Sequence, residues 1–249
     1  SLYLAVNDIL SAPKRFVTVI VTFSLCTLLI LIIANTANTM KSDKLVHLFG
    51  PVSDVYITDV ADSMSYMNEQ GKDALKEHLD DMAEEYPDAG MPCTAHISLI
   101  YYYEIGYEGT SYSYACEQDM NNTVDDFIYN EGSAPTNKNE IAITDMFTEL
   151  TGAKIGDTVT MDFGKGPENM LITAKFQSMN DLRKIILLHQ DAETDFLHLK
   201  SPMQYRLDFT DDPDQKTIDE RIEKIKDMTG NDKVQNAADF SADCVKVYD

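Results

Sequence analysis

The sequence predicts a mixed α/β (α+β) fold that follows one N-terminal transmembrane helix. Three observations lead to this prediction. An apolar run of 19 residues without a charge, 16–34, lies near the N-terminus. Beyond it, segments that alternate apolar and polar residues are interspersed with segments that repeat apolar residues every three to four positions, which predicts strands and amphipathic helices. With 249 residues and a hydrophobic fraction of 44%, the chain can bury a sizeable core.

The chain is strongly acidic, with 42 acidic against 20 basic residues and a net charge of −22. This balance argues against nucleic acid as a partner, because proteins that bind a phosphate backbone need clustered lysine and arginine. It is compatible with a cationic peptide as ligand, although many exterior domains are acidic for solubility alone. The first 41 residues carry +2, which leaves −24 for the remainder, so we infer two different environments.

The apolar run predicts a retained transmembrane helix within 16–40. At about 1.5 Å per residue, the uncharged part of this helix is roughly 28 Å long, close to the thickness of the hydrocarbon core of a bilayer. A secretory signal has a shorter apolar core of about 7–15 residues. Ser24 and Leu25, which precede Cys26, are in the wrong order for a lipoprotein site.

Basic residues before the run set the expected orientation. Lys14 and Arg15 directly precede it, so the positive-inside rule places the N-terminus in the cytoplasm. Residues 1–15 are then a cytoplasmic amphipathic segment, which Pro13 would end. Residues 41–249 form an extracellular domain of a protein in the plasma or inner membrane.

The first part of the exterior segment predicts a strand, a helix and a hairpin. The strand covers 54–60, the helix 65–90, and the hairpin arms 96–103 and 110–116, with glycines 106 and 109 at the turn. One face of the helix carries an apolar stripe of Leu75, Leu79, Met82 and Tyr86. The tyrosines of the hairpin are compatible with a packed sheet in which the hydroxyl groups contact solvent. They are also compatible with a face that binds a peptide or sugar.

Two cysteines flank the predicted hairpin. Outside the membrane a disulfide is permitted, and the two ends of a hairpin can come within bonding distance, so we expect a Cys93–Cys116 bridge. Cys244 is a third exterior thiol, which keeps open the alternative that all three are free.

The middle of the domain contains a polar stretch and then a compact unit. Residues 117–138 predict a loop with one short element around VDDFIY and a glycosylation sequon at 121–123. A strand at 141–143 follows, and Thr144 caps a short helix that turns Met146, Phe147 and Leu150 inward. Gly152 ends this helix, Gly156 and Asp157 form a turn, and a hairpin of strands closes the unit.

The last part predicts strands at 183–188 and 204–210 and a helix that Gly230 ends. Ile218, Ile222, Ile225 and Thr229 lie on one face of this helix. The tail 239–249 is expected to be a final strand.

The compact unit at 140–160 contains a sequence pattern that resembles a known family. It reads EIAIT at 140–144, LTG at 150–152 and IGDTVT at 155–160. Together with the preceding basic-flanked span, this pattern resembles the exterior domain of FtsX-like and MacB-like ABC transporter permeases. Ala174 and Lys175 stand where the family often has a glycine, so the chain departs from the pattern there.

The resemblance implies an exterior α/β domain of two subdomains, in which Gly152, Gly156 and Asp157 serve turns and a helix end rather than a site. It implies a permease subunit, here one span with its exterior domain as a fragment of a longer protein. Such a subunit pairs with a cytoplasmic ABC ATPase subunit. It forms a homodimer or joins a second permease half, and it transmits nucleotide-driven movement to the exterior. An extracellular protein is a further candidate partner.

No catalytic or cofactor-binding residues are expected. The sequence has no G-x-x-x-x-G-K-[ST], H-E-x-x-H, C-x-x-C or G-x-S-x-G motif, so ATP would be hydrolysed by a separate subunit. His189, Glu193, Asp195 and His198 are the best metal candidates, but their spacing matches no standard site and is typical of a solvated loop. Two alternatives stay open, a single-pass membrane sensor and a membrane-anchored enzyme.

Overall fold

The computed structural model describes residues 13–39, 43–58, 71–121 and 124–246, and the chain divides into two compact units, Ser1–Ser42 and Asp43–Asp249. The first unit contains the helix α2, Pro13–Thr39. Pro13, expected to end a helix, begins one, because a proline in the first turn lacks only an N–H that would have no helical partner. Most of the predicted cytoplasmic segment, residues 1–12, lies outside the described residues.

Helix α2 contains a stretch of 20 residues, Phe16–Asn35, that is long and apolar enough to cross a membrane. None of its side chains is buried, and those of residues 17–35 are exposed. The hydroxyls of Thr18, Thr22 and Thr27 donate to backbone carbonyls four residues earlier, each at 2.9 Å. These bonds satisfy the threonine donors inside the helix itself, so the threonines are compatible with a hydrocarbon surrounding.

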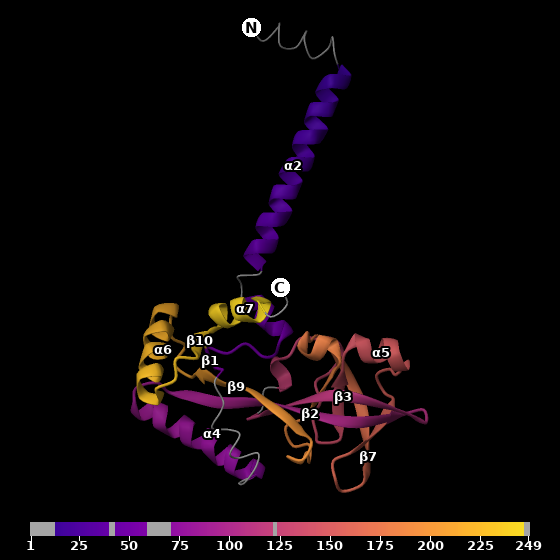
Figure 1. Ribbon diagram of the computed structural model, residues 1–249, viewed down its shortest axis with the longest axis vertical. Helices are drawn as coiled ribbons and strands as arrows, with labels where there is room; N and C mark the ends of the chain where they lie inside the picture. Colours follow the sequence, from indigo (N-terminus) through magenta and orange to yellow (C-terminus); the bar gives the residue numbers. More distant parts are fainter. Residues whose placement is uncertain (1–12, 40–42, 59–70, 122–123, 247–249) are drawn as a thin grey trace. The chain divides into compact units, whose positions relative to one another are not determined.

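The second unit, Asp43–Asp249, is built on one sheet of ten strands. The strands are β1 Val55–Ile57, β2 Cys93–Tyr107, β3 Thr110–Met120, β4 Tyr129–Gly132, β5 Glu140–Ile143, β6 Thr158–Asp162, β7 Pro167–Phe176, β8 Ile185–Leu188, β9 Leu199–Phe209 and β10 Val234–Asn236. Figure 1 labels β1, β2, β3, β7, β9 and β10 among them. Their order is β10-β1-β9-β2-β3-β8-β5-β7-β4, and β6 pairs with both β2 and β7.

This pairing divides the sheet into two parts. Because β6 joins β7 back to β2, the strands β2, β3, β8, β5, β7 and β6 form a closed ring. The other part, β10-β1-β9, pairs through β9 with residues 93–101 of β2, on the edge away from β3 that β6 also uses farther along. The expected mixed α/β fold is confirmed, and the long strand β2 belongs to both parts.

Two helices pack on the main core with the predicted apolar stripes. In α4, Gly71–Asp88, the buried residues are Leu75, Leu79, Met82 and Tyr86. In α6, Gln215–Thr229, they are Ile218, Ile222 and Ile225, whereas Thr229, expected on the same face, is exposed at the end of the helix. All seven belong to the largest hydrophobic cluster, so the stripes face the sheet as the helical period requires.

Shorter elements complete the unit. They are the helices α5 Asp145–Thr151 and α7 Ala237–Lys246 and the 3₁₀ turns η1 Asp43–Leu48, η3 Val124–Asp126 and η4 Asn180–Arg183. The predicted final strand was wrong, because α7 is a helix. Ala237, Phe240, Ser241 and Cys244 recur at helical spacing, and Phe240 and Ser241 are buried.

The compact unit follows its prediction except at two residues. Gly152 ends α5 with a φ of 80°, and its N–H donates to the Thr148 carbonyl at 2.8 Å. Gly156 has a φ of 92°, as its turn requires. Leu150 was expected inward but is 51% exposed, although it follows Phe147 by three residues and so lies on nearly the same face of the helix. Thr144 stands at the N-cap, but its hydroxyl donates to the Arg183 carbonyl at 2.6 Å instead of capping the helix.

Asp157 has contacts that the sequence did not indicate. Its Oδ2 accepts a hydrogen bond from the Tyr107 hydroxyl at 2.7 Å and another from the Lys154 N–H at 2.9 Å. These bonds hold the pKa of Asp157 below its usual value. Asp157 therefore ties the turn before β6 to the end of β2.

The expected disulfide does not form. Cys93 and Cys116 are both free and buried. Cys116 lies opposite Tyr101 on β2, whereas Cys93 lies opposite Phe209 on β9. At about 3.4 Å per strand residue, Cys93 is roughly 27 Å from the position opposite Cys116, far beyond disulfide reach.

We expect all four cysteines to titrate as thiols when the chain is unfolded without reductant. Before unfolding, Cys93 and Cys116 should react slowly, because burial raises the pKa of both thiols. A thiol assay with and without denaturant measures both numbers. Two missing thiols in the unfolded sample would contradict the structure.

Candidate functional site

Polar side chains fill one face of the sheet where a core would normally be apolar. Strand alternation on β3 turns Glu117 and Asp119 to this face, and β9 contributes Arg206. All three side chains are fully buried. The predicted loop 117–138 was therefore wrong at its start, since β3 continues to Met120. Polar residues that satisfy one another inside a sheet cannot be distinguished from loop residues by pattern alone.

Arg206 joins the sheet to the chain that follows η1. Its Nη2 donates to Asp119 Oδ2 in a fully buried ion pair. Its Nη1 donates to the Pro51 carbonyl at 3.4 Å. A guanidinium has several donors in a fixed plane, so it can hold a carboxylate and a backbone oxygen at once.

Asn180, in η4, makes a second connection to the same chain. Its Nδ2 donates to the Phe49 carbonyl at 3.0 Å and to Glu117 Oε2 at 3.1 Å. Beside it, the N–H of Met179 donates to the Leu48 carbonyl at 2.6 Å. The successive carbonyls of Leu48, which ends η1, and of Phe49 are thus bonded to Met179 and Asn180 at the start of η4.

Tyr56, on β1, makes the third connection. Its hydroxyl accepts from the Ser53 N–H at 2.8 Å and donates to the Pro51 carbonyl at 3.2 Å. Its ring stacks on Phe240 of α7, with centroids 4.1 Å apart and planes 4° apart. Val46 of η1 packs into the same small cluster, so η1 and α7 meet over β1 (Figure 1).

We call Tyr56, Asn180 and Arg206 the anchor, because each holds a backbone group of the segment 48–53. This segment begins where η1 ends, shortly after α2. The anchor residues come from β1, η4 and β9, three elements far apart in sequence. The segment is therefore fixed to the sheet by buried hydrogen bonds, which unlike surface contacts do not exchange with water.

Glu117 gives the anchor an unusual charge state. Burial raises the pKa of Glu117 to about 8, and the neighbouring charge of Asp119 adds to this effect, while the hydrogen bond from Asn180 and the charge of Arg206 oppose it. Glu117 therefore keeps its proton at neutral pH. Arg206 and Asp119 then balance each other, so the buried cluster carries no net charge.

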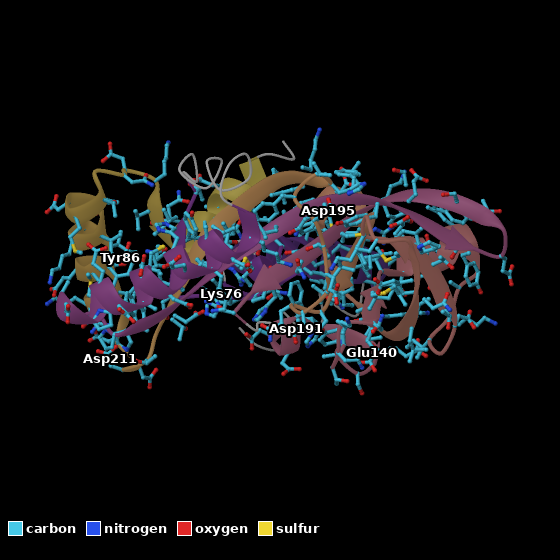
Figure 2. All side chains as sticks on the ribbon, turned by 90° about the horizontal axis from the view of Figure 1, so that it is seen from below. Lys76, Tyr86, Glu140, Asp191, Asp195 and Asp211 are labelled. Atoms are coloured by element: carbon cyan, nitrogen blue, oxygen red, sulfur yellow. The ribbon has the colours of Figure 1, made fainter. Side chains whose placement is uncertain are left out.

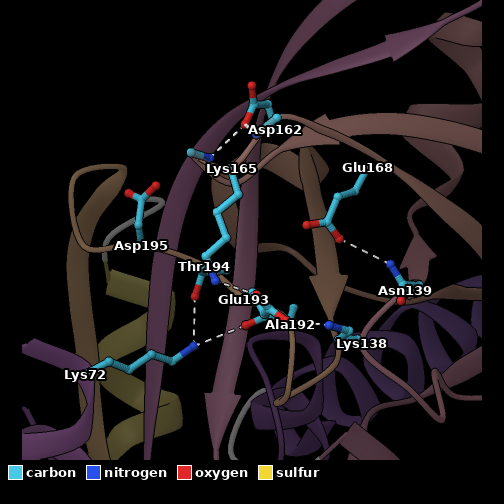
Figure 3. A network of polar contacts seen from close by, with 12 residues as sticks. Lys72, Lys138, Asn139, Asp162, Lys165, Glu168, Ala192, Glu193, Thr194 and Asp195 are labelled. Atoms are coloured by element: carbon cyan, nitrogen blue, oxygen red, sulfur yellow. Dashed lines mark hydrogen bonds and ion pairs between the residues drawn. The ribbon is translucent and has the colours of Figure 1, made fainter.

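A second polar network lies on the other face of β3, around the loop after β8 (Figure 3). Lys72 Nζ donates to Gln118 Oε1 at 2.8 Å, to Thr194 Oγ1 at 2.9 Å and to the Ala192 carbonyl at 3.3 Å. The amide nitrogen of Gln118 donates to three carbonyls of the same loop, those of residues 189, 190 and 192. Burial lowers the pKa of Lys72 to about 8. The network thus attaches α4 to this loop.

The metal candidates of the sequence lie in this loop but do not converge. Glu193 pairs with Lys138 and Lys165, whose hydrogen bonds lower its pKa to about 2. Asp195 Oδ1 lies 2.9 Å from Nδ1 of His198, and His189 lies beside Asp191. Within the described residues no group of three or more His, Cys, Asp or Glu could hold a metal ion.

Replacing Lys72 by methionine should lower the free energy of unfolding by about 1–3 kcal/mol, because Thr194 Oγ1 loses its donor from Lys72 and Gln118 Oε1 keeps only the hydrogen bond from Thr194. Lys76→Met is the matched control. Lys76 pairs with Asp80 on the surface of the same helix, so its loss should cost less than about 0.5 kcal/mol. Chemical denaturation of the full chain in detergent micelles measures both values. Equal losses would show that the Lys72 network is not specifically stabilising.

Acidic side chains are spread over the unit Asp43–Asp249. Figure 2 labels carboxylates at 140, 191, 195 and 211, and they lie at separate places rather than around one pocket. The net charge alone therefore points to no single site for a cationic peptide.

Comparison with known proteins gives structural likenesses only. No family model matches the sequence, and no curated protein matches it. The fold is similar to that of the periplasmic region of MacB from Actinobacillus actinomycetemcomitans, with a TM-score of 0.47 and 10% identity, over 82% of this chain and 94% of that one. It is also similar to the extracellular domain of the noncanonic ABC-type transporter YknZ from Gram-positive bacteria, with a TM-score of 0.41 and 11% identity, over 74% of this chain and 98% of that one.

At these identities and TM-scores the likeness concerns the fold, and the roles of single residues are derived from the contacts of this chain.

Proposed function

We propose that the chain is part of an ABC transporter permease, and that its exterior unit receives movement from the transmembrane helix through the anchor. The observation that carries this proposal is the attachment of residues 48–53 to the sheet by Tyr56, Asn180 and Arg206. The motif at 140–160 and the apolar helix α2 support the same assignment.

The path of the movement follows the chain. A displacement of α2 passes through η1 to the segment 48–53, and the anchor passes it on to β1, β9 and the central strand β3. Protein interiors are close-packed and resist compression, so a segment bonded to the sheet moves the sheet with it. A flexible linker at the same place would absorb the displacement instead.

The motor in this proposal is a separate protein. The sequence has no phosphate-binding P-loop, so a cytoplasmic ATPase subunit would bind and hydrolyse ATP. Lys14 and Arg15 before the span favour a cytoplasmic N-terminus by the positive-inside rule, on the side where such a subunit would bind. Two copies of the chain, or this chain and a second permease half, would form the membrane part.

The test uses the protein purified with its cytoplasmic ATPase from the host membrane. A spin label at the exposed position Asp227 of α6 would report the distance between the exterior units of two copies. We expect nucleotide to change this distance, and Asn180→Ala to reduce the change while ATP hydrolysis continues. Asn130→Ala is the control, since Asn130 is exposed and bonds only to Gln177 among the described contacts.

Two results would refute the proposal. Absence of any co-purified ATPase, with a kinase or methyl-accepting domain continuing the same polypeptide, would favour the sensor. A nucleotide response that is identical in the wild type, Asn180→Ala and Asn130→Ala would show that the anchor transmits nothing.

A further inference from the structure

The turn at 181–184 has a conformation that ordinary residues avoid. Asp181, Leu182 and Arg183 have φ values of 45°, 53° and 69°, so three successive non-glycine residues lie in the left-handed region. Contacts on either side impose this conformation. The Tyr102 hydroxyl donates to Asp181 Oδ2 at 3.2 Å, and Thr144 Oγ1 donates to the Arg183 carbonyl at 2.6 Å.

The turn exposes the apolar side chain of Leu182 between the charged residues Asp181 and Arg183. Leu182 is 69% exposed. Arg183 and Lys184 follow it directly and are also exposed. Two adjacent cations are unusual in an exterior segment that carries −24, and a leucine beside Arg and Lys is the side-chain chemistry of a lipid interface.

Only a short stretch of chain separates the proposed span from the element to which this turn is bonded. Helix α2 ends at Thr39 and η1 begins at Asp43, and four residues reach at most about 14 Å. η1 ends at Leu48, whose carbonyl accepts from Met179 just before the turn. The turn is therefore bonded to the first part of the exterior unit that leaves the membrane.

We propose that the turn 181–184 contacts the outer lipid surface, with Leu182 entering the interface and Arg183 and Lys184 bound to lipid phosphates. The inference rests on the transmembrane assignment of α2 made above. It adds a second attachment of the exterior unit to the bilayer, next to the anchor.

The experiment compares fluorescent labels on the full chain in vesicles that contain anionic lipid, with Cys26 and Cys244 replaced by serine. One label is attached at Leu182→Cys and one at Leu197→Cys. Leu197 is the control, because it is 93% exposed and lies in the loop just before β9, outside the turn. A third label at Ile30→Cys, within α2, reports whether the span is in the bilayer.

We expect nitroxide-bearing lipids to quench the label at 182 several-fold more than the label at 197. Arg183→Glu with Lys184→Glu should abolish this difference, since each basic residue near an anionic surface contributes about fivefold in binding. Equal quenching at 182 and 197 would overturn the inference.

Protection of the label at 182 from both lipid and aqueous quenchers, with energy transfer between labelled copies, would overturn it in favour of contact between copies. Absence of lipid quenching at position 30 would instead contradict the assignment of α2 as a transmembrane helix, and with it the proposed function.

Discussion

Replacing Arg206 by methionine should lower the free energy of unfolding by about 3–5 kcal/mol, because it leaves the buried carboxylate of Asp119 without its cation. The Pro51 carbonyl also loses a donor. Chemical denaturation of the full chain in detergent micelles, fitted with a common slope for all variants, measures the change.

The matched control is Lys216→Met. Lys216 pairs with Glu220 on the surface of α6, with side chains 84% and 67% exposed, so its loss should cost less than about 0.5 kcal/mol. Combining Arg206→Met with Asp119→Leu should recover part of the stability, because an apolar pair leaves no buried charge. A loss at Arg206 as small as the control would show that the buried pair does not hold the sheet and the segment 48–53 together.

The second large effect is a dependence of stability on pH that originates at Glu117. Its pKa in the folded chain is about 8, raised from 4.5 mainly by burial. Below the lower value both the folded and the unfolded chain are protonated, and the stability is fully present. Between the two values only the unfolded chain releases the proton, so the free energy of unfolding falls as pH rises toward 8, by on the order of a few kcal/mol in total.

Glu117→Gln should remove most of this slope, because glutamine resembles the protonated acid and cannot ionise. Asp54 and Asp126 also have raised pKa values, mainly through burial, so a smaller slope of the same sign should remain. Glu149→Gln, on the surface of α5, should leave the slope unchanged. Stability curves of the three proteins between pH 5 and 8 test this, and parallel curves for wild type and Glu117→Gln would refute the proton assignment.

A proton on Glu117 bears on the proposed function because Asn180 bonds to both Glu117 and Phe49. Ionisation adds a second negative charge beside Asp119 that Arg206 alone cannot balance. We therefore expect the anchor to loosen at alkaline pH before the apolar core does.

The sequence predicted the parts of the fold that depend on local patterns. The stripe Leu75–Tyr86 identified α4 because its apolar period matches the helix, and Gly152 and Gly156 marked turns because only glycine adopts a positive φ freely. Local patterns also misled. The Cys93–Cys116 hypothesis assumed a hairpin with ends at those residues, whereas β2 and β3 pair with an offset that places Tyr101 opposite Cys116.

The anchor could not be predicted, because its residues have no common sequence signal. Asn180 lies in a 3₁₀ turn, and Arg206 occupies a strand position that would usually be apolar. Only the order of the sheet, with β9 between β1 and β2, brings Arg206 near both Pro51 and Asp119. Such long-range pairing is decided by the whole fold, and a single sequence does not reveal it.

The most direct test of the central claim is hydrogen exchange at two amides of the full chain in a membrane mimetic. The Ser53 N–H donates to the Tyr56 hydroxyl, and the Met179 N–H donates to the Leu48 carbonyl. If the segment after the span is fixed to the sheet, both amides exchange slowly in the wild type and much faster in Asn180→Ala, while the amides of α4 keep their rates. Fast exchange at Ser53 and Met179 in the wild type would show that the segment is loose, and would contradict transmission through the anchor.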